Sequence, residues 1–589
     1  MTEIADAVGS RARDFSALTG PLTRLKAGHP YRVTYRSLDR EAGLRRRTGT
    51  VLLGVLVVAF DMLFVAWLLT PAHFPWVADL ETPSPVDVVL IASIAVVEVF
   101  RLLNLISLAL ASVIVRDPVP IEPAGDLRVA FLTTIVPGKE PVDMVRTTLE
   151  AALRIRYTGT LDVWLLDEGD DPFVAQMCRE IGVRHFSRKD VAAYNTEAGE
   201  FRARTKHGNY NAWIDRHGHG YDVFLSVDPD HVPLPSYAER MLGYFRDPDV
   251  AFVAGPQAYA NSESFIARSA ESQQFPFHSL IQRAANTHRA AMLVGTNNAV
   301  RIDALRSIGG IQDSITEDMA TGLALHARRN PATGRRWDSV YTPDVVALGE
   351  GPTSWGDYFG QQLRWSRGTL EIFGGVFWRR ARRLPPRRGL HYLLLMTFYP
   401  SMALSWVLGS INAIMCLVVG ATGLVVSPTI WLALYVDVLL AQLWIFVRNR
   451  RYNVSPVETE GSPGLVGIFM SLLSAPLFAA SLVQTVLGRQ TRFVVTPKGA
   501  AAGVDGLWTF RLHLGWAALM GGALCVAALR GSLRIEVLLW PMTVLLICLA
   551  PVVHWLSRRR FRPDLDEVVP VPIVVPAQTR RTVSEEAAS

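Results

Sequence analysis

The sequence predicts an α/β catalytic domain with a mostly parallel sheet, inserted between groups of α-helical transmembrane segments. Two observations lead to this fold class. Long uncharged runs lie towards both ends of the 589-residue chain, whereas residues 125–350 have the charge of an ordinary soluble domain. Within that middle part, short β-rich runs alternate with helical patterns, which is typical of a parallel sheet.

Six segments are apolar enough over a sufficient length to cross a membrane. They are expected over about 49–70, 86–115, 391–420, 423–447, 507–529 and 534–556. Arginines give the orientation, because cytoplasmic loops are enriched in Lys and Arg. The tail before the first span carries Arg45, Arg46 and Arg47, whereas the loop 71–85 has neither Lys nor Arg. The N-terminus and the catalytic domain are therefore expected in the cytoplasm, with no cleaved signal peptide.

A further apolar run, 464–487, is assigned from the charges around it. If it crossed the bilayer, Arg489, Arg492 and the cluster 558–560 would lie outside. An interfacial or re-entrant helix keeps all of them inside, although Arg530 and Arg534 then lie outside. We therefore expect six spans and one interfacial helix in a multi-pass protein of the inner (plasma) membrane.

The predicted organisation follows from these segments. In chain order it comprises a cytoplasmic N-terminal tail (1–48), two transmembrane helices (49–115), the catalytic domain (125–350), amphipathic interface helices (351–388), two transmembrane helices (389–447), the interfacial helix (464–487), a loop (489–503), two transmembrane helices (507–556) and a cytoplasmic, disordered C-terminal tail (557–589). The net charge of +6 gathers beside apolar runs, so no nucleic-acid partner is expected. The four cysteines form no CxxC pair, which argues against a disulfide framework or a structural zinc site.

Acidic residues follow two of the β-rich runs. Asp167 comes directly after the run 163–166, and Asp228 and Asp230 come after the run 224–227. Ligands of open α/β sheets bind at the carboxyl ends of the strands, so these side chains are site candidates. Two carboxylates two residues apart can share a divalent cation with phosphate oxygens, and oxygen ligands suit Mg²⁺ or Mn²⁺. A short acidic turn also occurs without any ligand, so this pair is weak evidence by itself.

Two further clusters come later in the chain. Glu317 and Asp318 follow Thr316 at the start of a helical pattern, where a plain helix N-terminus would also favour them. Gln361, Arg364 and Trp365 lie on a helical stretch that could equally be amphipathic and rest on the membrane. Arginine can pair with a diphosphate, and an indole ring can stack on a sugar face.

In this order, the four clusters resemble the D, DxD, TED and QxxRW motifs of family 2 processive glycosyltransferases, which include cellulose, chitin and hyaluronan synthases. Two more segments are similar to bacterial cellulose synthase: Lys206-His207-Gly208-Asn209 resembles its KxGN segment, and 493–498 (FVVTPK) resembles its FxVTxK gating loop. The resemblance extends from about Val129 to Lys498. It implies a GT-A-type glycosyltransferase domain within the membrane protein.

The resemblance also implies roles for individual residues. Asp318 would be the catalytic base, and Asp230 would ligate Mg²⁺ or Mn²⁺. Residues expected to bind the nucleotide sugar are Asp167, Lys206, Asp228, Asp230, Gln361, Arg364 and Trp365. Glu317 and Trp365 would contact the acceptor. Phe493, Thr496 and Lys498 would belong to a gating loop that closes over the donor.

The implied reaction is processive, inverting polymerisation of a cellulose-like β-1,4-glucan from UDP-glucose, with translocation across the membrane. The implied partners are a UDP-sugar, the growing polysaccharide, the lipid bilayer and accessory export subunits. No PilZ-like domain is expected after the last span, and therefore no activation by cyclic di-GMP through such a domain.

The sequence departs from the family pattern in three places. Pro137-Gly138-Lys139-Glu140 lacks the usual Tyr, Asp167-Glu168-Gly169 replaces DDG, and Val294-Gly295-Thr296-Asn297 replaces a Cys-Gly-Ser or Cys-Gly-Thr segment on the acceptor side. The last change leaves β-1,3-glucan, chitin, hyaluronan and mannan open as products. A non-processive membrane glycosyltransferase and a non-catalytic scaffold are further alternatives.

Overall fold

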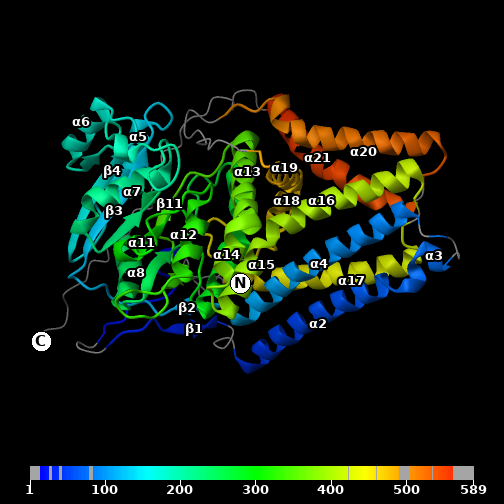
Figure 1. Cartoon of the computed structure of the whole chain (residues 1–589), viewed down its shortest axis with the longest axis horizontal. Coiled ribbons are helices and arrows are strands. Elements are labelled where there is room, and N and C mark those ends of the chain that lie inside the picture. Colours follow the sequence, from blue (N-terminus) through cyan, green and yellow to red (C-terminus); the bar gives the residue numbers. More distant parts are fainter. Residues whose placement is uncertain are drawn as a thin grey trace, which may run out of the picture.

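The computed structural model describes residues 14–25, 30–38, 43–78, 82, 84–421, 423–458, 461–489, 503–533 and 535–561. A sheet domain lies at one end of the molecule, and long helices run alongside one another at the other end (Figure 1). Helix α13 (Trp355–Glu371) stands between these two parts.

The sheet domain is built on a seven-stranded sheet of order β10-β8-β9-β6-β3-β4-β5. Its strands are β3 (Arg128–Ile135), β4 (Thr160–Asp167), β5 (Arg184–Phe186), β6 (Val223–Ser226), β8 (Val250–Ala254), β9 (Asn298–Arg301) and β10 (Asp338–Tyr341). All pairings are parallel except those of β9, which is antiparallel to both β6 and β8. The mostly parallel sheet is confirmed, and so are the three strands that the β-rich runs 128–136, 161–166 and 223–227 predict.

The sheet is covered on both faces, which explains the continuous apolar character of its strands. Alternate residues of β3 enter two different cores. Val129 and Phe131 pack with residues of α5 (Val142–Ala152) and α6 (Pro172–Ile181). Ala130 and Leu132 belong to the core that contains Trp213 of α7 (Lys206–His217).

Shorter elements complete the molecule. Around the sheet domain they are β1 (Tyr35–Ser37), β2 (Arg116–Pro118), β7 (Val232–Pro233), β11 (Ala347–Leu348), α8 (Tyr237–Met241), α9 (Phe265–Phe275), α10 (Gln282–Ala285), α11 (Ile302–Arg306), α12 (Glu317–His326) and α14 (Phe377–Ala381). Helix α3 (Pro75–Ala78) lies at the far end of the long helices (Figure 1). The N-terminal segment is joined to the sheet domain through β1, which pairs with β2, and through Thr19, whose Oγ1 donates to Asp344 at 2.6 Å.

Six helical stretches are long and apolar enough to cross a membrane. They are Arg47–Leu68, Pro386–Val419, Thr429–Tyr452, Leu465–Val486, Leu507–Leu529 and Val537–Arg559. Five of them correspond to expected spans, and Leu465–Val486 is the run predicted to be interfacial. The remaining expected span, 86–115, is the 30-residue helix α4 (Pro85–Ile114), which is not among these six.

The part of the molecule away from the sheet domain consists of helices that pack against one another. These helices are α2 (Leu44–Leu68), α4, α15 (Pro386–Met396), α16 (Phe398–Ile414), α17 (Pro428–Asn449), α20 (Arg511–Leu529) and α21 (Ile535–Phe561). Helix α4 packs against α2, α16 and α17, and α21 packs against α16 and α20. In Figure 1 these helices extend away from the sheet domain.

The run 464–487 differs from these long helices. It consists of α18 (Leu465–Leu473) and α19 (Ala475–Val486), with Ser474 between them. Helix α18 packs on α9, where a Cβ at Gly467 would lie 2.4 Å from the carbonyl oxygen of Ser272. Helix α19 packs on α13 and α16. Length and composition alone do not separate a crossing helix from an interfacial one, so the interfacial assignment stays a prediction.

Candidate active site

The acidic turn after β4 is held by a dense set of hydrogen bonds. Asp167 is fully buried; its Oδ1 accepts from Gly169 N at 2.8 Å, and its Oδ2 accepts from Asp171 N at 2.7 Å. The Nε2 of His185 lies 3.1 Å from the same Oδ2. These partners fix the Asp167 carboxylate behind the turn. Contact of Asp167 with a nucleotide stays a prediction.

Glu168 is paired with Arg188, which the sequence gave no reason to single out. The Arg188 guanidinium is completely buried and approaches Glu168 Oε1 at 2.8 Å. Further N–H groups of Arg188 donate to the carbonyl oxygens of Tyr194, Arg202 and Thr205 at 2.9, 3.1 and 3.2 Å. Arg188 therefore joins the acidic turn to the loop that leads into α7.

Helix α7 begins with Lys206, and the side chain of this lysine is directed at the DxD segment. Its Nζ donates to Asp228 Oδ1, and to the carbonyl oxygen of Gly295 at 2.7 Å. Burial lowers the pKa of Lys206, but the charge and hydrogen bond of Asp228, together with Tyr210 and Glu317, raise it by more, so its net pKa is raised. The lysine is therefore cationic at neutral pH. The backbone N–H of Asp228 donates to Thr296 Oγ1 at 3.0 Å, so the unusual Val294–Asn297 segment directly supports the DxD.

Asp228, Asp230 and His231 form a group able to hold a metal ion. One ligand atom from each lies within 4.8 Å of those of the other two. Asp230 and His231 are buried; His231 Nδ1 lies 3.3 Å from Asp230 Oδ1, and its Nε2 has no hydrogen-bond partner among the described residues. Two carboxylates and an adjacent imidazole fit a divalent cation such as Mg²⁺ or Mn²⁺. His231 adds to the predicted DxD pair.

Glu317 and Asp318 begin α12 and place two half-buried carboxyl groups together. Burial and the neighbouring Asp318 raise the pKa of Glu317 to about 7. Burial also raises the pKa of Asp318, although its carboxylate accepts from Met319 N at 2.7 Å. Thr316 makes no side-chain cap bond, so the interpretation of this segment as an ordinary capped helix start is not supported.

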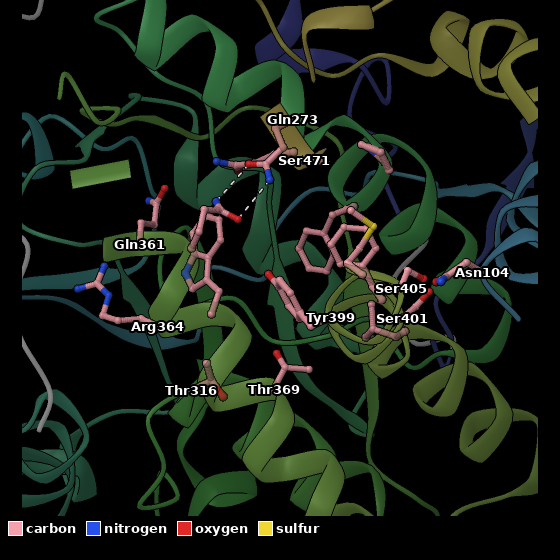
Figure 2. A pocket seen from close by; sticks show the side chains of 18 of the residues that line it. Asn104, Gln273, Thr316, Gln361, Arg364, Thr369, Tyr399, Ser401, Ser405 and Ser471 are labelled. Carbon is pink, nitrogen blue, oxygen red and sulfur yellow. Dashed lines mark hydrogen bonds between the residues drawn. The ribbon is translucent and has the colours of Figure 1, made fainter. Parts of the chain in front are cut away.

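The QxxRW motif lies on α13 and lines the same cavity. Gln361, Arg364 and Thr316 are labelled in Figure 2, where dashed lines mark hydrogen bonds of Gln273. Gln273 exchanges two hydrogen bonds with Gln362 of α13, at 3.2 and 3.1 Å. Burial lowers the pKa of Arg364, while the charges of Asp228, Glu317 and Asp230 act to raise it. These are the carboxylates of the DxD and TED segments. A Cβ at Gly368 would lie 2.4 Å from the side chain of Thr316, so α13 and the TED segment pack closely there.

A single cavity of about 3020 Å³ joins these segments to the long helices. The predicted site residues that line it are Lys206, Asp228, Asp230, Glu317, Asp318, Gln361, Arg364 and Trp365. Asp167 is not part of the lining, although Glu168 is. The cavity continues between α4, α16, α17 and α21, where polar and aromatic side chains line it: Asn104, Ser401, Ser405, Gln442 and Trp540. Figure 2 shows Tyr399, Ser401, Ser405 and Asn104 on that side of the pocket.

The predicted gating residues Phe493, Thr496 and Lys498 lie outside the described residues. The residues on either side of that segment both attach to α13. Arg367 donates to the carbonyl oxygen of Arg489 at 2.5 Å, and the Asp505 carboxylate accepts from Trp355 N and Gly356 N, both at 2.9 Å. The helix that carries QxxRW therefore also anchors both flanks of the predicted loop.

The sheet domain, the acidic cluster at its strand ends and the cavity towards the long helices define an α/β domain joined to helices that are long and apolar enough to cross a membrane. A family model described as "Glycosyl transferase family group 2" matches residues 223–556, more than half of the chain. The chain belongs to this family, and the predicted GT-A-type domain between apolar helices is confirmed.

The similar curated proteins are cellulose synthases. The chain is 28% identical over 268 residues to the cellulose synthase catalytic subunit [UDP-forming] of Komagataeibacter sucrofermentans, covering 44% of this chain and 33% of that protein. It is 24% identical over 574 residues to putative cellulose synthase 2 of Komagataeibacter xylinus, covering 90% of this chain and 34% of that protein. The matched part thus spans about a third of the length of these relatives.

Solved structures show more distant likeness. A mannosyltransferase from Pyrobaculum calidifontis, solved with GDP-mannose and Mn²⁺, is 14% identical and has a TM-score of 0.44, covering 69% of this chain and 99% of that one. Glucosyl-3-phosphoglycerate synthase from Mycobacterium tuberculosis, solved with Mn²⁺ and UDP, is 10% identical with a TM-score of 0.27, covering 38% of this chain and 72% of that one.

Proposed function

We propose that this protein polymerises a β-1,4-glucan from UDP-glucose by inverting transfer and moves the product across the membrane. One observation carries the proposal: the cavity that holds the acidic and basic site residues continues between the long apolar helices. A soluble product would need no such continuation. A chain that lengthens at the site would enter it directly.

The donor end of the proposed site is formed by cations and carboxylates. Lys206 and Arg364 line the cavity beside the DxD segment, where they would stabilise the charge that develops on the leaving diphosphate. Asp228, Asp230 and His231 would hold Mg²⁺ or Mn²⁺. When bound, this cation supplies positive charge next to the diphosphate. Gln361, on the same helix as Arg364, would contribute a polar contact to the donor.

The chemical step needs a base, because a sugar hydroxyl is a poor nucleophile at neutral pH. Asp318 is half-buried, lines the cavity and has a raised pKa, which suits a proton acceptor. The acceptor hydroxyl would attack the anomeric carbon and form a new C–O bond, while the bond from that carbon to the diphosphate oxygen breaks. The hydroxyl proton passes to Asp318 and UDP departs. Glu317 and Trp365 would contact the acceptor sugar.

The predicted loop at 489–503 would exclude water while the donor is bound. Its Phe493, Thr496 and Lys498 would close over the nucleotide sugar and limit hydrolysis. The attachment of both flanks to α13, through Arg489 and Asp505, supports this role because a change at the loop would reach the QxxRW helix directly.

We place the sheet domain on the cytoplasmic side of the inner (plasma) membrane, since the arginine clusters favour that orientation. Accessory export subunits would receive the polymer on the opposite side. The names of the relatives, cellulose synthases that form UDP, support the choice of UDP-glucose and of a β-1,4-glucan.

A donor and linkage assay tests this proposal. Purified protein in lipid vesicles is offered radiolabelled UDP-glucose, UDP-N-acetylglucosamine or GDP-mannose with Mg²⁺ or Mn²⁺, and the product is digested with linkage-specific glucanases. We expect high-molecular-weight product from UDP-glucose that a β-1,4-glucanase degrades. Cleavage by a β-1,3-glucanase alone, or polymer from another donor, would contradict the proposed product. Absence of nucleotide binding would contradict the site itself.

A further inference from the structure

Six arginines are concentrated where the sheet domain meets the long helices. The segment 378–390, which we call the polybasic segment, contains Arg379, Arg380, Arg382, Arg383, Arg387 and Arg388. It includes the end of α14 and the start of α15, and Figure 1 shows both helices between the sheet domain and the bundle. No step of the proposed reaction uses these side chains.

Two of the six arginines attach the segment to the sheet domain. Arg380 donates to Gln312 Oε1 at 2.6 Å and to the carbonyl oxygen of Ala320 at 3.2 Å. Arg388 is buried, donates to the carbonyl oxygen of Trp337 at 2.7 Å and pairs with Asp338. These contacts give the segment a defined position.

The other four, Arg379, Arg382, Arg383 and Arg387, are exposed, and none forms an ion pair within the part of the chain that the structure describes. They also repel one another. Burial lowers the pKa of Arg380, and the charges of Arg379 and Arg383 lower it further. Four cations held together without a counter-charge form a surface that attracts an anion.

The position of the segment indicates which anion. The stretch Pro386–Val419, which is long and apolar enough to cross a membrane, begins within the segment. When this stretch crosses a bilayer, the arginines lie where the lipid headgroups meet it. Two apolar side chains beside the arginines are also exposed, Trp378 by 53% and Leu390 by 50%. An indole at this depth is typical of a membrane interface, and Lys/Arg clusters next to a span attract anionic lipids.

We propose that the polybasic segment is a binding site for anionic phospholipids, with the four exposed arginines contacting the phosphate headgroups and with Trp378 and Leu390 contacting the acyl boundary. The combination of charge and exposed apolar side chains fits a lipid better than an acidic polypeptide or free phosphate, neither of which brings an apolar part to this depth.

Such a lipid would lie at one end of the helix that carries QxxRW. Helix α13 continues through the π-helical turn Ile372–Val376 into α14, so Trp365 and Arg379 belong to one helical stretch. Phe377, at the start of α14, packs in the same core as Met319 and Ala320 of α12. Anionic lipid at the polybasic segment would therefore hold both catalytic helices in place. This consequence rests on the proposed function, whereas the lipid site does not.

Lipid retention tests the site without turnover. Purified full-length protein is equilibrated with equal amounts of phosphatidylglycerol and phosphatidylcholine, and the retained lipids are counted by native mass spectrometry. The variant R379Q/R382Q/R383Q is compared with R154Q/R179Q/R216Q, whose three arginines are exposed, without an ion pair in the described part of the chain, and located on the sheet domain. Each arginine near an anionic membrane surface contributes roughly a five-fold factor to the affinity for that surface.

We expect the wild-type protein to prefer phosphatidylglycerol, and the first variant to lose at least five-fold of that preference while the control variant keeps it. Replacement of the same three arginines by lysine should restore most of the preference, which distinguishes a charge effect from misfolding. Inorganic phosphate at millimolar concentration should leave the preference unchanged. An unchanged preference in R379Q/R382Q/R383Q, an equal loss in the control variant, or displacement by phosphate alone would overturn the proposal.

Discussion

Two pairs of adjacent carboxyl groups lie beside the cavity, and the protein surrounds them in opposite ways. Asp167 accepts hydrogen bonds from two backbone N–H groups and lies beside His185. Glu168 forms an ion pair with the buried Arg188. Glu317 and Asp318 are half-buried and have raised pKa values: burial raises both, and the charge of Asp318 further raises that of Glu317. Backbone hydrogen bonds with Met319 and Gly295 act to lower the pKa of Asp318, but its net pKa is raised.

The difference separates positioning from proton transfer. A carboxylate with several hydrogen-bond donors around it is held in a fixed position. A carboxyl group with a raised pKa can accept a proton near neutral pH. Perturbed pairs of this kind cluster at functional sites. We therefore infer that Asp167 and Glu168 hold the turn after β4 in place, whereas the pair Glu317 and Asp318 takes part in proton transfer.

The largest effect is expected for Asp318→Asn. Removing the proposed base should lower the polymerisation rate on the order of 100- to 10,000-fold, because a positioned base contributes that much. UDP binding, measured by titration calorimetry, should change little. Asp313→Asn is the control, since Asp313 lines the same cavity but is paired with Arg202 at 3.2 Å. Loss of UDP affinity in Asp318→Asn would contradict the assignment of the base.

Arg188→Met should be the most destabilising of these variants. It leaves Glu168 without its buried partner, and breaking such a pair costs about 3 kcal/mol or more. We expect a clear fall in the thermal unfolding midpoint. Arg184→Met is the matched control. The Arg184 guanidinium lies 3.1 Å from Asp162, and its side chain is 56% exposed. Losing this exposed ion pair should therefore lower the free energy of unfolding by less than about 1 kcal/mol. Equal midpoints for the two variants would show that Arg188 does not organise the turn.

Glu317→Gln should change the pH profile more than the maximal rate. The base must be ionised, so activity falls as the pH drops through the raised pKa of Asp318. Burial and the charge of Asp318 raise the pKa of Glu317 to about 7, so Glu317 ionises after Asp318 as the pH rises. The glutamine should remove any inflection near pH 7 and leave the acidic limb set by Asp318 in place. The measurement is the initial rate across pH, and an inflection near pH 7 that persists in the variant would contradict electrostatic coupling within the pair.

Asp505→Asn should have the smallest effect. The Asp505 carboxylate accepts two backbone N–H groups at the N-terminus of α13, where a negative charge is favoured. Replacing the carboxylate by a neutral amide should lower the free energy of unfolding by about 1 kcal/mol. This is measured as a modest fall in the thermal unfolding midpoint. A variant as stable as the wild type would show that the flank of the loop is held to α13 by other contacts.

Part of this site could be predicted because its residues follow recognisable apolar strands. The runs at 128–136, 161–166 and 223–227 placed Asp167 and Asp228 at strand ends, and the sheet confirms that placement. The pairing of Glu168 with Arg188 could not be predicted, since twenty residues separate them and only the order of β4 and β5 brings them together.

Other features carried no usable pattern. Strand β9 is four residues, Asn-Ala-Val-Arg, with neither a long apolar run nor clear alternation, so its antiparallel position was not foreseen. The run 464–487 is apolar whether it crosses the membrane or lies along it, and only the surrounding charges suggested the second. His231 was adjacent to Asp230 in the sequence, but its contribution to a metal site depends on the fold of the turn.

A protection assay on inside-out vesicles tests the central claim most directly. With the sheet domain outside, vesicles of purified protein are supplied with radiolabelled UDP-glucose and Mg²⁺, and then treated with β-1,4-glucanase before or after detergent. The account predicts a polymer that resists the enzyme until detergent opens the vesicles, because the product has passed through the cavity between the long helices. A product digested fully without detergent, or one that stays short, would contradict coupled polymerisation and translocation.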